Sequence, residues 1–568
     1  MLSSFALLDQ NWLPVRRASG SVETIRPSDV TAGPADDPII AFNWPRADFD
    51  AAAREFMVGL LSTACWSRVR GDEWEAWWSE PPPPDVLQDW FAPLSPAFRL
   101  DGDGPGFMQD LDPLDDGSVC DVSALLIDAP GANTITRNAD LFVKRGQVRQ
   151  LGRPAAAMAL FTLQTFAPSG GAGHRTSLRG GGPLTTIVVP DGWSRDAPPS
   201  LWRLLWANVF WQSDWPNPLD RLDRVFPWLA PTRVSKSGKQ TTPDDVHPAQ
   251  AFWGMPRRIR LDFDAATIKQ PCDLTGATDD VVAARYRTRP HGNNYEGWSR
   301  AHPLTPYRRA KPGAAEWLPV HGQPGRLAYR DWLGLVVNDA DDTPTRVPAA
   351  ILSLARARLL DVGHTPSCRL SASGYDMDNM KARGFVESQM PLHLFPEGAV
   401  RTYADAAVRT LVTAARRSQD ALSAYIGRAL APGNPPAAGK GDRHLATIRF
   451  WDQTEQSFYR LLDTLADGFA PLSTDPDLLE EMVPTLVQRV AREWLQVLRR
   501  EALAIFDDLV RLDSLDFESL ESRIAARRSL VNTFNGASKA GEALFTGLGL
   551  PVPERNPAGK RQMTETVS

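Results

Sequence analysis

The stretch that decides our interpretation of this 568-residue chain is Ala167-Pro168-Ser169-Gly170-Gly171-Ala172-Gly173-His174-Arg175-Thr176-Ser177-Leu178-Arg179-Gly180-Gly181-Gly182-Pro183-Leu184-Thr185-Thr186-Ile187. It combines six glycines between positions 170 and 182 with two arginines and a histidine, and leads into a β-branched run. Glycine adopts positive φ and lets another backbone approach closely. Exposed N–H groups and guanidinium forks both favour anions, so the composition suits phosphates. An ordinary flexible surface loop is the alternative.

Two well-known phosphate loops do not fit this stretch. A Walker A loop needs Gly-x4-Gly-Lys-Ser/Thr, but the corner at Gly173 has no lysine, and position 168 is Pro168 rather than glycine. A dinucleotide-binding fingerprint needs a third glycine at position 176, which is Thr176. Neither nucleotide-binding class is therefore indicated.

Further short segments follow one another along the chain with plausible spacing. They are Asn11-Trp12-Leu13-Pro14-Val15-Arg16, Pro105-Gly106-Phe107-Met108-Gln109, Phe252-Trp253-Gly254-Met255-Pro256, His302-Pro303-Leu304-Thr305-Pro306 and Gly374-Tyr375. Together with the glycine-rich stretch, they resemble the CasA family, the large subunit of the type I-E CRISPR surveillance complex, Cascade. The resemblance implies a subunit without catalysis that recognises the protospacer-adjacent motif in double-stranded DNA. It also implies promotion of strand separation, recruitment of a helicase-nuclease, and partnership with other Cascade subunits and crRNA.

The length and the hydropathy pattern predict an α+β protein of two parts and a tail. A chain of 568 residues with 43% hydrophobic residues is long enough for two cores. We expect a large mixed domain over residues 1–399, a four-helix bundle over 400–546 and a disordered tail over 547–568. The bundle helices are expected at 403–430, 444–465, 484–510 and 517–546. Helical periodicity also appears at 51–66, 201–211 and 349–360, and strand patterns at 11–15 and 259–264.

Charge, cysteines and apolar runs exclude several classes. The net charge is −6, which argues against a protein that coats nucleic acid by charge alone. The four cysteines form no Cys-x-x-Cys pair, so no zinc site is indicated. Some family members carry a cysteine cluster near Cys272, but this chain has one cysteine there, and we expect no metal or other cofactor. The absence of a long apolar run and of a secretion signal predicts a cytoplasmic protein.

The resemblance places the first DNA contacts in two loops. The family reads its motif from the minor groove, and we expect Gly170, Gly171, Ala172 and Gly173 to pass close to it, while Arg175 and Arg179 suit phosphates. The polar and basic segment 131–150 matches a loop that lies against the crRNA end and the DNA motif in Cascade. Within it, Phe142 aligns with a family phenylalanine, and Lys144 stands where some relatives have asparagine. A solvated loop is the alternative for this segment.

Two further segments are expected to enter the duplex. Arginines at 285, 287 and 289 project to one side of an extended chain, because strand side chains alternate. Relatives hold a basic finger near here, for which Arg287 and Arg289 are the candidates. A merely solvated basic face is the alternative. Asp378, Asn379 and Met380 follow Gly374-Tyr375 where the family has a wedge beside the motif. Methionine is a plausible apolar wedge.

The third bundle helix carries a basic stripe. At 100° per residue, its four arginines fall within an arc of about 100°. In this family such a stripe could guide a displaced DNA strand, whereas elsewhere it is usually a solvated face. The members are Arg489, Arg492, Arg499 and Arg500.

Two other functions remain as alternatives at this stage. A nuclease would need clustered histidines or paired carboxylates, and Asp376 and Asp378 lack a third ligand nearby. The second alternative is a purely structural ribonucleoprotein subunit that never touches the motif. It would share all the family features, so only DNA binding by the assembled complex, with and without this subunit, distinguishes it from a motif-reading subunit.

Overall fold

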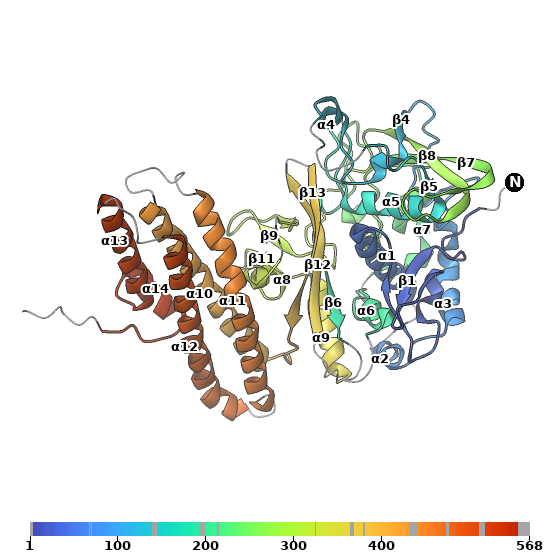
Figure 1. The fold of residues 1–568 in the computed structure, drawn as a ribbon. Helices are drawn as coiled ribbons and strands as arrows, with labels where there is room; N and C mark the ends of the chain where they lie inside the picture. Colours follow the sequence, from blue (N-terminus) through green and yellow to red (C-terminus); the bar gives the residue numbers. More distant parts are fainter. Residues whose placement is uncertain are drawn as a thin grey trace, which may run out of the picture. The chain divides into compact units, whose positions relative to one another are not determined.

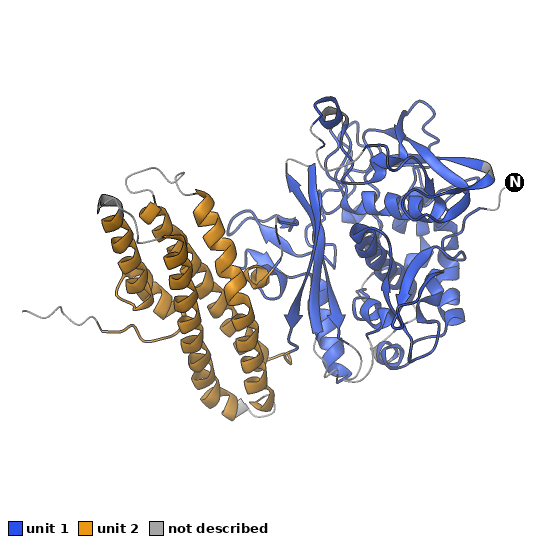
Figure 2. Cartoon of the chain, in the orientation of Figure 1, with its two compact units in different colours: residues 1–327, 334–394 blue, residues 328–333, 395–568 orange. Residues whose placement is uncertain are grey.

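The computed structural model divides the chain into two compact units. It describes residues 4–66, 69, 71–138, 140, 145–171, 173–191, 199–212, 215–323, 325, 327–363, 368–378, 381–430, 440–472, 476–510 and 517–554. Unit 1 comprises Met1–Leu327 and Gly334–Leu394, and unit 2 comprises Ala328–Leu333 and Phe395–Ser568 (Figure 2). Unit 1 mixes helices and strands, whereas unit 2 is helical, so the α+β expectation is confirmed.

The core of unit 1 surrounds one buried helix, α1. Its middle residue Phe56 contacts five aromatic rings edge-on, with centroids 5.3–6.0 Å away. Such edge-to-face pairs add to the free energy gained from burial alone. The five rings come from distant parts of the sequence, so α1 fixes the surrounding segments against one another: Trp12, Phe98, Phe107, Phe161 and Trp253. The first part of unit 1 contains β1 (Leu13–Arg17), β2 (Val22–Ile25), β3 (Ile39–Phe42), α1 (Ala47–Cys65), α2 (Gly71–Ser79) and α3 (Pro84–Phe91).

A long antiparallel hairpin, β7–β8, forms the next sheet (Figure 1). Strands β4 and β5 pair with β8 on its other edge. Helix α5 follows β5 directly and is buried along most of its length. It ends at Phe166, where the glycine-rich stretch begins. The elements are α4 (Ala132–Thr136), β4 (Ser118–Asp121), β5 (Leu151–Gly152), α5 (Arg153–Phe166), β7 (Arg258–Pro271) and β8 (Thr278–Arg289).

The glycine-rich stretch leads into the buried strand β6, which is the edge of a third sheet. Strand β12 pairs with β6 on one side and with β13 on the other, all antiparallel. A small sheet, β10-β9-β11, completes unit 1. The elements are β6 (Thr185–Pro190), α6 (Leu201–Ala207), α7 (Leu222–Val225), β9 (Tyr307–Arg309), β10 (Trp317–Pro319), β11 (Arg346–Val347), α9 (Ala350–Asp361), β12 (Cys368–Asp378) and β13 (Lys381–Leu392).

Unit 2 is built from long helices and one segment that comes from earlier in the chain. Tyr329, in the segment Ala328–Leu333, is fully buried, and its ring stacks on Phe458 with centroids 4.5 Å apart. Its hydroxyl is 2.6 Å from that of Thr454. The helices are α10 (Ala399–Leu430), α11 (Lys440–Phe469), α12 (Pro476–Leu509), α13 (Phe517–Phe534) and α14 (Lys539–Gly547), and α8 (Trp332–Leu335) begins in the inserted segment.

Two sequence expectations need correction. The fourth bundle helix is not continuous over 517–546, because the chain turns at Gly536 with φ +71° and restarts at α14 behind the Ser538 cap. The helix expected at 201–211 ends at Ala207. There the side chain of Asn208 exchanges two hydrogen bonds with the backbone of Val188, so the chain leaves the helix to follow the sheet edge.

Candidate nucleic-acid interface

The glycine loop, residues 170–173, lies between α5 and β6, and Gly170 and Gly171 are exposed. Gly171 has φ +66° and is exposed, and a Cβ at this position would meet no atom within 4 Å. Gly173 has φ +85°, and its carbonyl accepts a hydrogen bond of 2.9 Å from the N–H of His291. Ala172 lies outside the described residues. The loop therefore presents bare backbone at the surface while one carbonyl fixes it to the end of β8.

Arg257 lies directly beneath this loop. Its guanidinium donates to the carbonyl of Pro168, and the amide of Gln164 at the end of α5 holds the backbone of Arg257 through both N–H and carbonyl. A Cβ at Gly170 would collide with this guanidinium. Burial lowers the pKa of Arg257 to about 10, so the group is still charged at neutral pH. Glycine at 170 is thus what lets a cation lie against the loop.

Two histidines accompany Arg257. The ring of His291 lies under Gly173, where a Cβ would come within 2.6 Å of it. His174 follows the loop, and its N–H donates to the carbonyl of Gly171 at 2.8 Å. Burial, followed by the charges of Arg257 and His291, lowers the pKa of His174, so its imidazole is neutral at pH 7. No carboxylate contributes to the shift in the pKa of His174. The side chains around the loop are therefore basic.

Arg175 and Arg179 belong to the same stretch but have different surroundings. Arg175 is half-buried and donates to the hydroxyl of Ser235 at 3.0 Å. Arg179 is buried and forms an ion pair of 2.7 Å with Glu55 of α1, with both side chains 2% exposed or less. The expectation that Arg179 contacts DNA is therefore wrong. Its charge is fully used inside unit 1, where it ties the stem of the glycine loop to the central helix.

The buried pair is completed by His302. Its Nε2 lies 3.4 Å from Glu55 Oε1, while its Nδ1 accepts from the backbone N–H of Leu304 at 3.3 Å. Burial would raise the pKa of Glu55, but Arg179 and His302 outweigh it and leave that pKa below its usual value. Burial and Arg179 lower the pKa of His302 to about 4, so it is neutral. The cluster therefore holds one negative and one positive charge and is structural.

The arginines of β8 project to one side, as expected, but they meet carboxylates. Tyr286 and Thr288 are buried while Arg287 and Arg289 are partly exposed, which confirms the alternation. Arg287 pairs with Asp115 at 2.6 Å, and Arg289 pairs with Asp116. A phosphate would have to displace these aspartates. Arg287 and Arg289 remain predicted DNA contacts, but they carry a neutralised charge.

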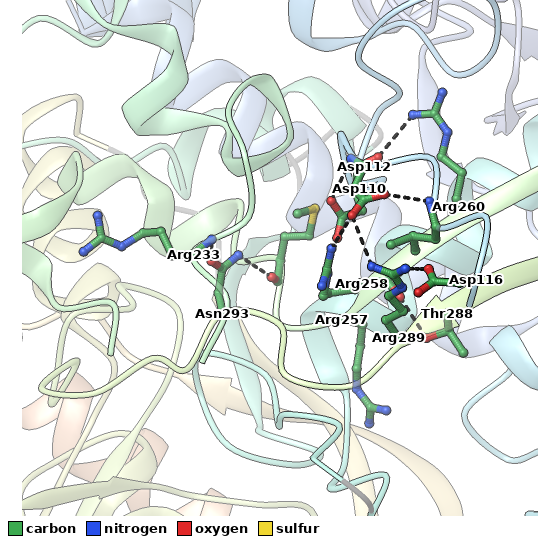
Figure 3. A network of polar contacts seen from close by, with 12 residues as sticks. Asp110, Asp112, Asp116, Arg233, Arg257, Arg258, Arg260, Thr288, Arg289 and Asn293 are labelled. Carbon is green, nitrogen blue, oxygen red and sulfur yellow. Dashed lines mark hydrogen bonds and ion pairs between the residues drawn. The ribbon is translucent and has the colours of Figure 1, made fainter. Parts of the chain in front are cut away.

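Arg258, at the start of β7, belongs to the same acidic cluster. It pairs with Asp110 at 2.5 Å in a buried position and with Asp112 at 3.0 Å. The backbone N–H of Leu114, together with Arg258 and Arg289, lowers the pKa of Asp112, so this carboxyl is ionised. Figure 3 shows Arg258 and Arg289 directed toward the aspartates and Arg257 directed away from them. Adjacent arginines therefore have opposite electrostatic surroundings.

The other expected contacts lie on separate parts of the chain. Asp378 ends β12 and is exposed, and its carboxylate is 3.7 Å from Arg383. Asn379 and Met380, between β12 and β13, lie outside the described residues, as do Phe142 and Lys144. The wedge and the loop that contains Phe142 therefore stay predictions.

The four stripe arginines of α12 are all exposed. Arg500 pairs with the adjacent Glu501 at 2.8 Å, and Arg492 donates to Gln488. Arg489 and Arg499 have no ion-pair partner within the described part of the chain. The expected stripe thus contains two arginines with acceptors from their own helix and two that face solvent.

The sequence interpretation missed the basic residues that surround the glycine loop. Arg257 and His291 are distant from the loop in sequence, and only the fold brings them beneath it. Lys236 and Lys239 are exposed in the segment after Ser235, whose N–H donates to the carbonyl of His291 at 3.0 Å. The one available signal was the position of Arg257 immediately after the Phe252–Pro256 motif.

The site contains donors and cations rather than catalytic groups. Within the described residues, no group of three or more histidine, cysteine or carboxylate side chains is placed to hold a metal ion. None of the helices in that part of the chain combines the length and apolar character that a bilayer span requires. Backbone N–H groups, an arginine and histidines can bind phosphate oxygens or base edges without making or breaking covalent bonds.

Comparison with known proteins gives one family. The sequence model of the CRISPR-associated protein Cse1 family matches residues 6–505. A search of curated proteins found no match. Several solved structures share the fold. Thermobifida fusca Cse1 is 18% identical with a TM-score of 0.64, and the match covers 96% of this chain and 98% of that one.

Two other structures agree. Thermus thermophilus CasA (Cse1) is 17% identical with a TM-score of 0.63, covering 93% of this chain and 99% of that chain. A chain of a CRISPR RNA-guided surveillance complex is 16% identical with a TM-score of 0.59, covering 93% and 99%. At these identities the structures establish the fold, while the family match extends over most of the sequence. The chain therefore belongs to the Cse1 (CasA) family of CRISPR-associated proteins.

Proposed function

We propose that this chain is the non-catalytic large subunit of a type I-E CRISPR RNA-guided surveillance complex. It recognises the protospacer-adjacent motif in double-stranded DNA, promotes strand separation for R-loop formation and helps recruit the helicase-nuclease. Base pairing with the guide RNA reads the target sequence, and protein reads the short motif. Family membership and the likeness to a chain of a surveillance complex support the assembly with other subunits and crRNA.

The observation that carries motif recognition is the exposed backbone of the glycine loop. Gly171 is exposed with φ +66°, and the space beside it is empty. The minor groove offers acceptors on every base pair, which backbone N–H groups can contact without a side chain. Opening a base step costs a few kcal/mol, which several close contacts can supply.

The test replaces Gly171 with valine in the assembled complex. The branched side chain fills the space that the DNA needs, so binding to a motif-bearing duplex should fall strongly while assembly survives. Gly20→Val is the matched control, because Gly20 also has positive φ, +89°, and empty space around it, in the β1–β2 turn. Both variants carry the backbone strain of a valine at positive φ, about 1–2 kcal/mol.

The measurement is the affinity for duplexes with and without the motif and for a target with a pre-opened bubble. We expect Gly171→Val to fail on the closed duplex and to recover on the bubble, where opening is supplied in advance. A Gly171→Val complex that binds the motif duplex as well as the parent does would refute motif reading by this loop. That outcome is expected under the alternative hypothesis, in which the chain is a purely structural subunit that never touches the motif.

A further inference from the structure

The glycine loop has hydrogen-bond donors that no protein atom uses. The N–H groups of Gly171 and Gly173 have no acceptor within the described residues, although the carbonyls of both glycines accept hydrogen bonds. Both residues have left-handed φ, +66° and +85°. The loop therefore retains two N–H groups that a ligand can use.

The side chains beneath the loop leave two buried nitrogen atoms without hydrogen-bond partners among the described residues. Arg257 Nε is buried and has no hydrogen-bond partner in the described part of the chain, and the same holds for His291 Nδ1. A buried donor without an acceptor is unfavourable, because it has lost its hydrogen bonds to water. A ligand that supplied acceptors here would recover part of that free energy.

No carboxylate balances Arg257 among the described residues. The only charge–charge effect that raises its pKa comes from Tyr286, which burial keeps neutral by raising its own pKa well above the usual value. Three other arginines of the same hairpin each pair with an aspartate: Arg258, Arg287 and Arg289. The site under the loop is therefore a place where positive charge is left uncompensated.

The surface beside this site is basic as well. Arg175 donates to Ser235, and Ser235 donates to the carbonyl of His291, so the segment after Ser235 is fixed next to the site. Lys236 and Lys239 of that segment are exposed. A single small anion would use only Arg257, whereas a polyanion would use Arg257 and the lysines together.

We propose that Arg257 binds one phosphate of the DNA backbone, with His174 and His291 beside it, while the N–H groups of Gly171 and Gly173 are left for the minor-groove acceptors. This inference rests on the proposed function and names the anchoring contact of that same surface. With one N–H on the carbonyl of Pro168, the planar guanidinium of Arg257 keeps its other N–H donors, in a geometry that matches phosphate oxygens. The phosphate fixes the register of the duplex on the loop and carries no sequence information itself.

The experiment compares Arg257→Gln with Arg54→Gln in the assembled complex. Arg54 is a matched control because it pairs with Glu387 at 2.6 Å and lies on α1, outside the proposed interface. Removing one charge-assisted hydrogen bond should weaken binding to motif duplex about tenfold. The slope of log affinity against log salt should fall by about 0.9. Arg54→Gln should change neither, and Arg257→Lys should restore part of the affinity.

A methylphosphonate scan locates the contacted phosphate. Duplexes in which one phosphate at a time is neutral should include one that weakens the parent but not Arg257→Gln. Gly170→Ala is a second variant, because its Cβ displaces the guanidinium and keeps the charge. It should reproduce the weaker binding at the same phosphate. If no phosphate distinguishes parent from variant, or if Arg257→Gln instead releases crRNA, the proposal is overturned.

The experiments distinguish failure of the phosphate site from failure of the proposed motif recognition. A parent complex that does not prefer motif duplex refutes the proposed function. In that case the isolated full chain, labelled at histidine, is titrated with inorganic phosphate and followed by NMR. Signals of His174 and His291 that shift in the parent but not in Arg257→Gln still support the phosphate site. Signals that shift in neither protein overturn it.

Discussion

Two loops contact arginines at the β7–β8 hairpin. One loop neutralises them with carboxylates, and the other supplies only a carbonyl. The loop from Asp110 to Asp116 places a carboxylate on Arg258 and on Arg289. The glycine loop places only the carbonyl of Pro168 on Arg257. An arginine that is paired at close range stabilises the fold and has little charge left for a ligand. The difference therefore separates arginines that hold the protein together from one that is available to bind.

The largest expected effect is on stability, at the paired side of the comparison. Arg258→Ala leaves Asp110 buried without its partner, and breaking such a pair costs about 3–5 kcal/mol. Urea unfolding followed by tryptophan fluorescence should show the decrease. Arg287→Ala, whose partner Asp115 is largely exposed, should cost less than about 1 kcal/mol. Equal decreases in the free energy of unfolding for the two variants would contradict the view that the buried pair stabilises the fold more than the exposed one.

The α12 stripe extends the comparison to unit 2. Replacing Arg489, Arg492, Arg499 and Arg500 by alanine should weaken DNA binding by the complex about equally for good and poor motifs. The salt slope should fall by up to about 0.9 for each phosphate that the variant no longer neutralises. Among pairs of substitutions, Arg489 with Arg499 should account for more of the weakening than Arg492 with Arg500, which already have acceptors. An effect confined to good motifs would show that the stripe reads bases.

The smallest expected effect is on His174. Its folded pKa lies below the ordinary 6.5, so its contribution to stability is complete above pH 6.5 and is lost as the pH falls below that value. Arg257→Gln removes a positive neighbour and should raise the pKa of His174, which makes stability less sensitive to acid. Histidine NMR titration measures the shift. Arg54→Gln should leave this pKa unchanged, and a shift in that control would point to a general change in the fold.

The sequence predicted the parts of the fold that depend on local pattern. The periodicity of 349–360 and the alternation of 259–264 became α9 and β7. It could not predict the break at Gly536, because a glycine inside an apolar helical pattern is compatible with both a continuous helix and a turn. Nor could it predict the end of α6, since the hydrogen bonds of Asn208 depend on a strand whose pairing is set elsewhere in the chain.

The candidate site was predicted less well, for an electrostatic reason. Arg179 looked like a phosphate ligand because of its glycine neighbours, but its partner Glu55 lies 124 residues earlier. Arg257 and Arg258 are indistinguishable in the sequence and differ only in which loop each faces. Whether a charge is available depends on long-range contacts, and composition does not contain them.

The segment Ala328–Leu333 has a consequence for synthesis. Tyr329 is an integral part of the core of unit 2, yet its partner Thr454 is 125 residues further along the chain. At roughly 5–20 residues per second, a ribosome needs about 6–25 seconds to make that distance. Unit 1 is finished only when Leu394 has been made, part-way through this interval, and the aromatic segment Ala328–Leu333 remains without its partners until the end of it. A chaperone that shields aromatic segments on nascent chains should therefore act at this point, and a fragment starting at Phe395 should fold with a hole where the tyrosine belongs.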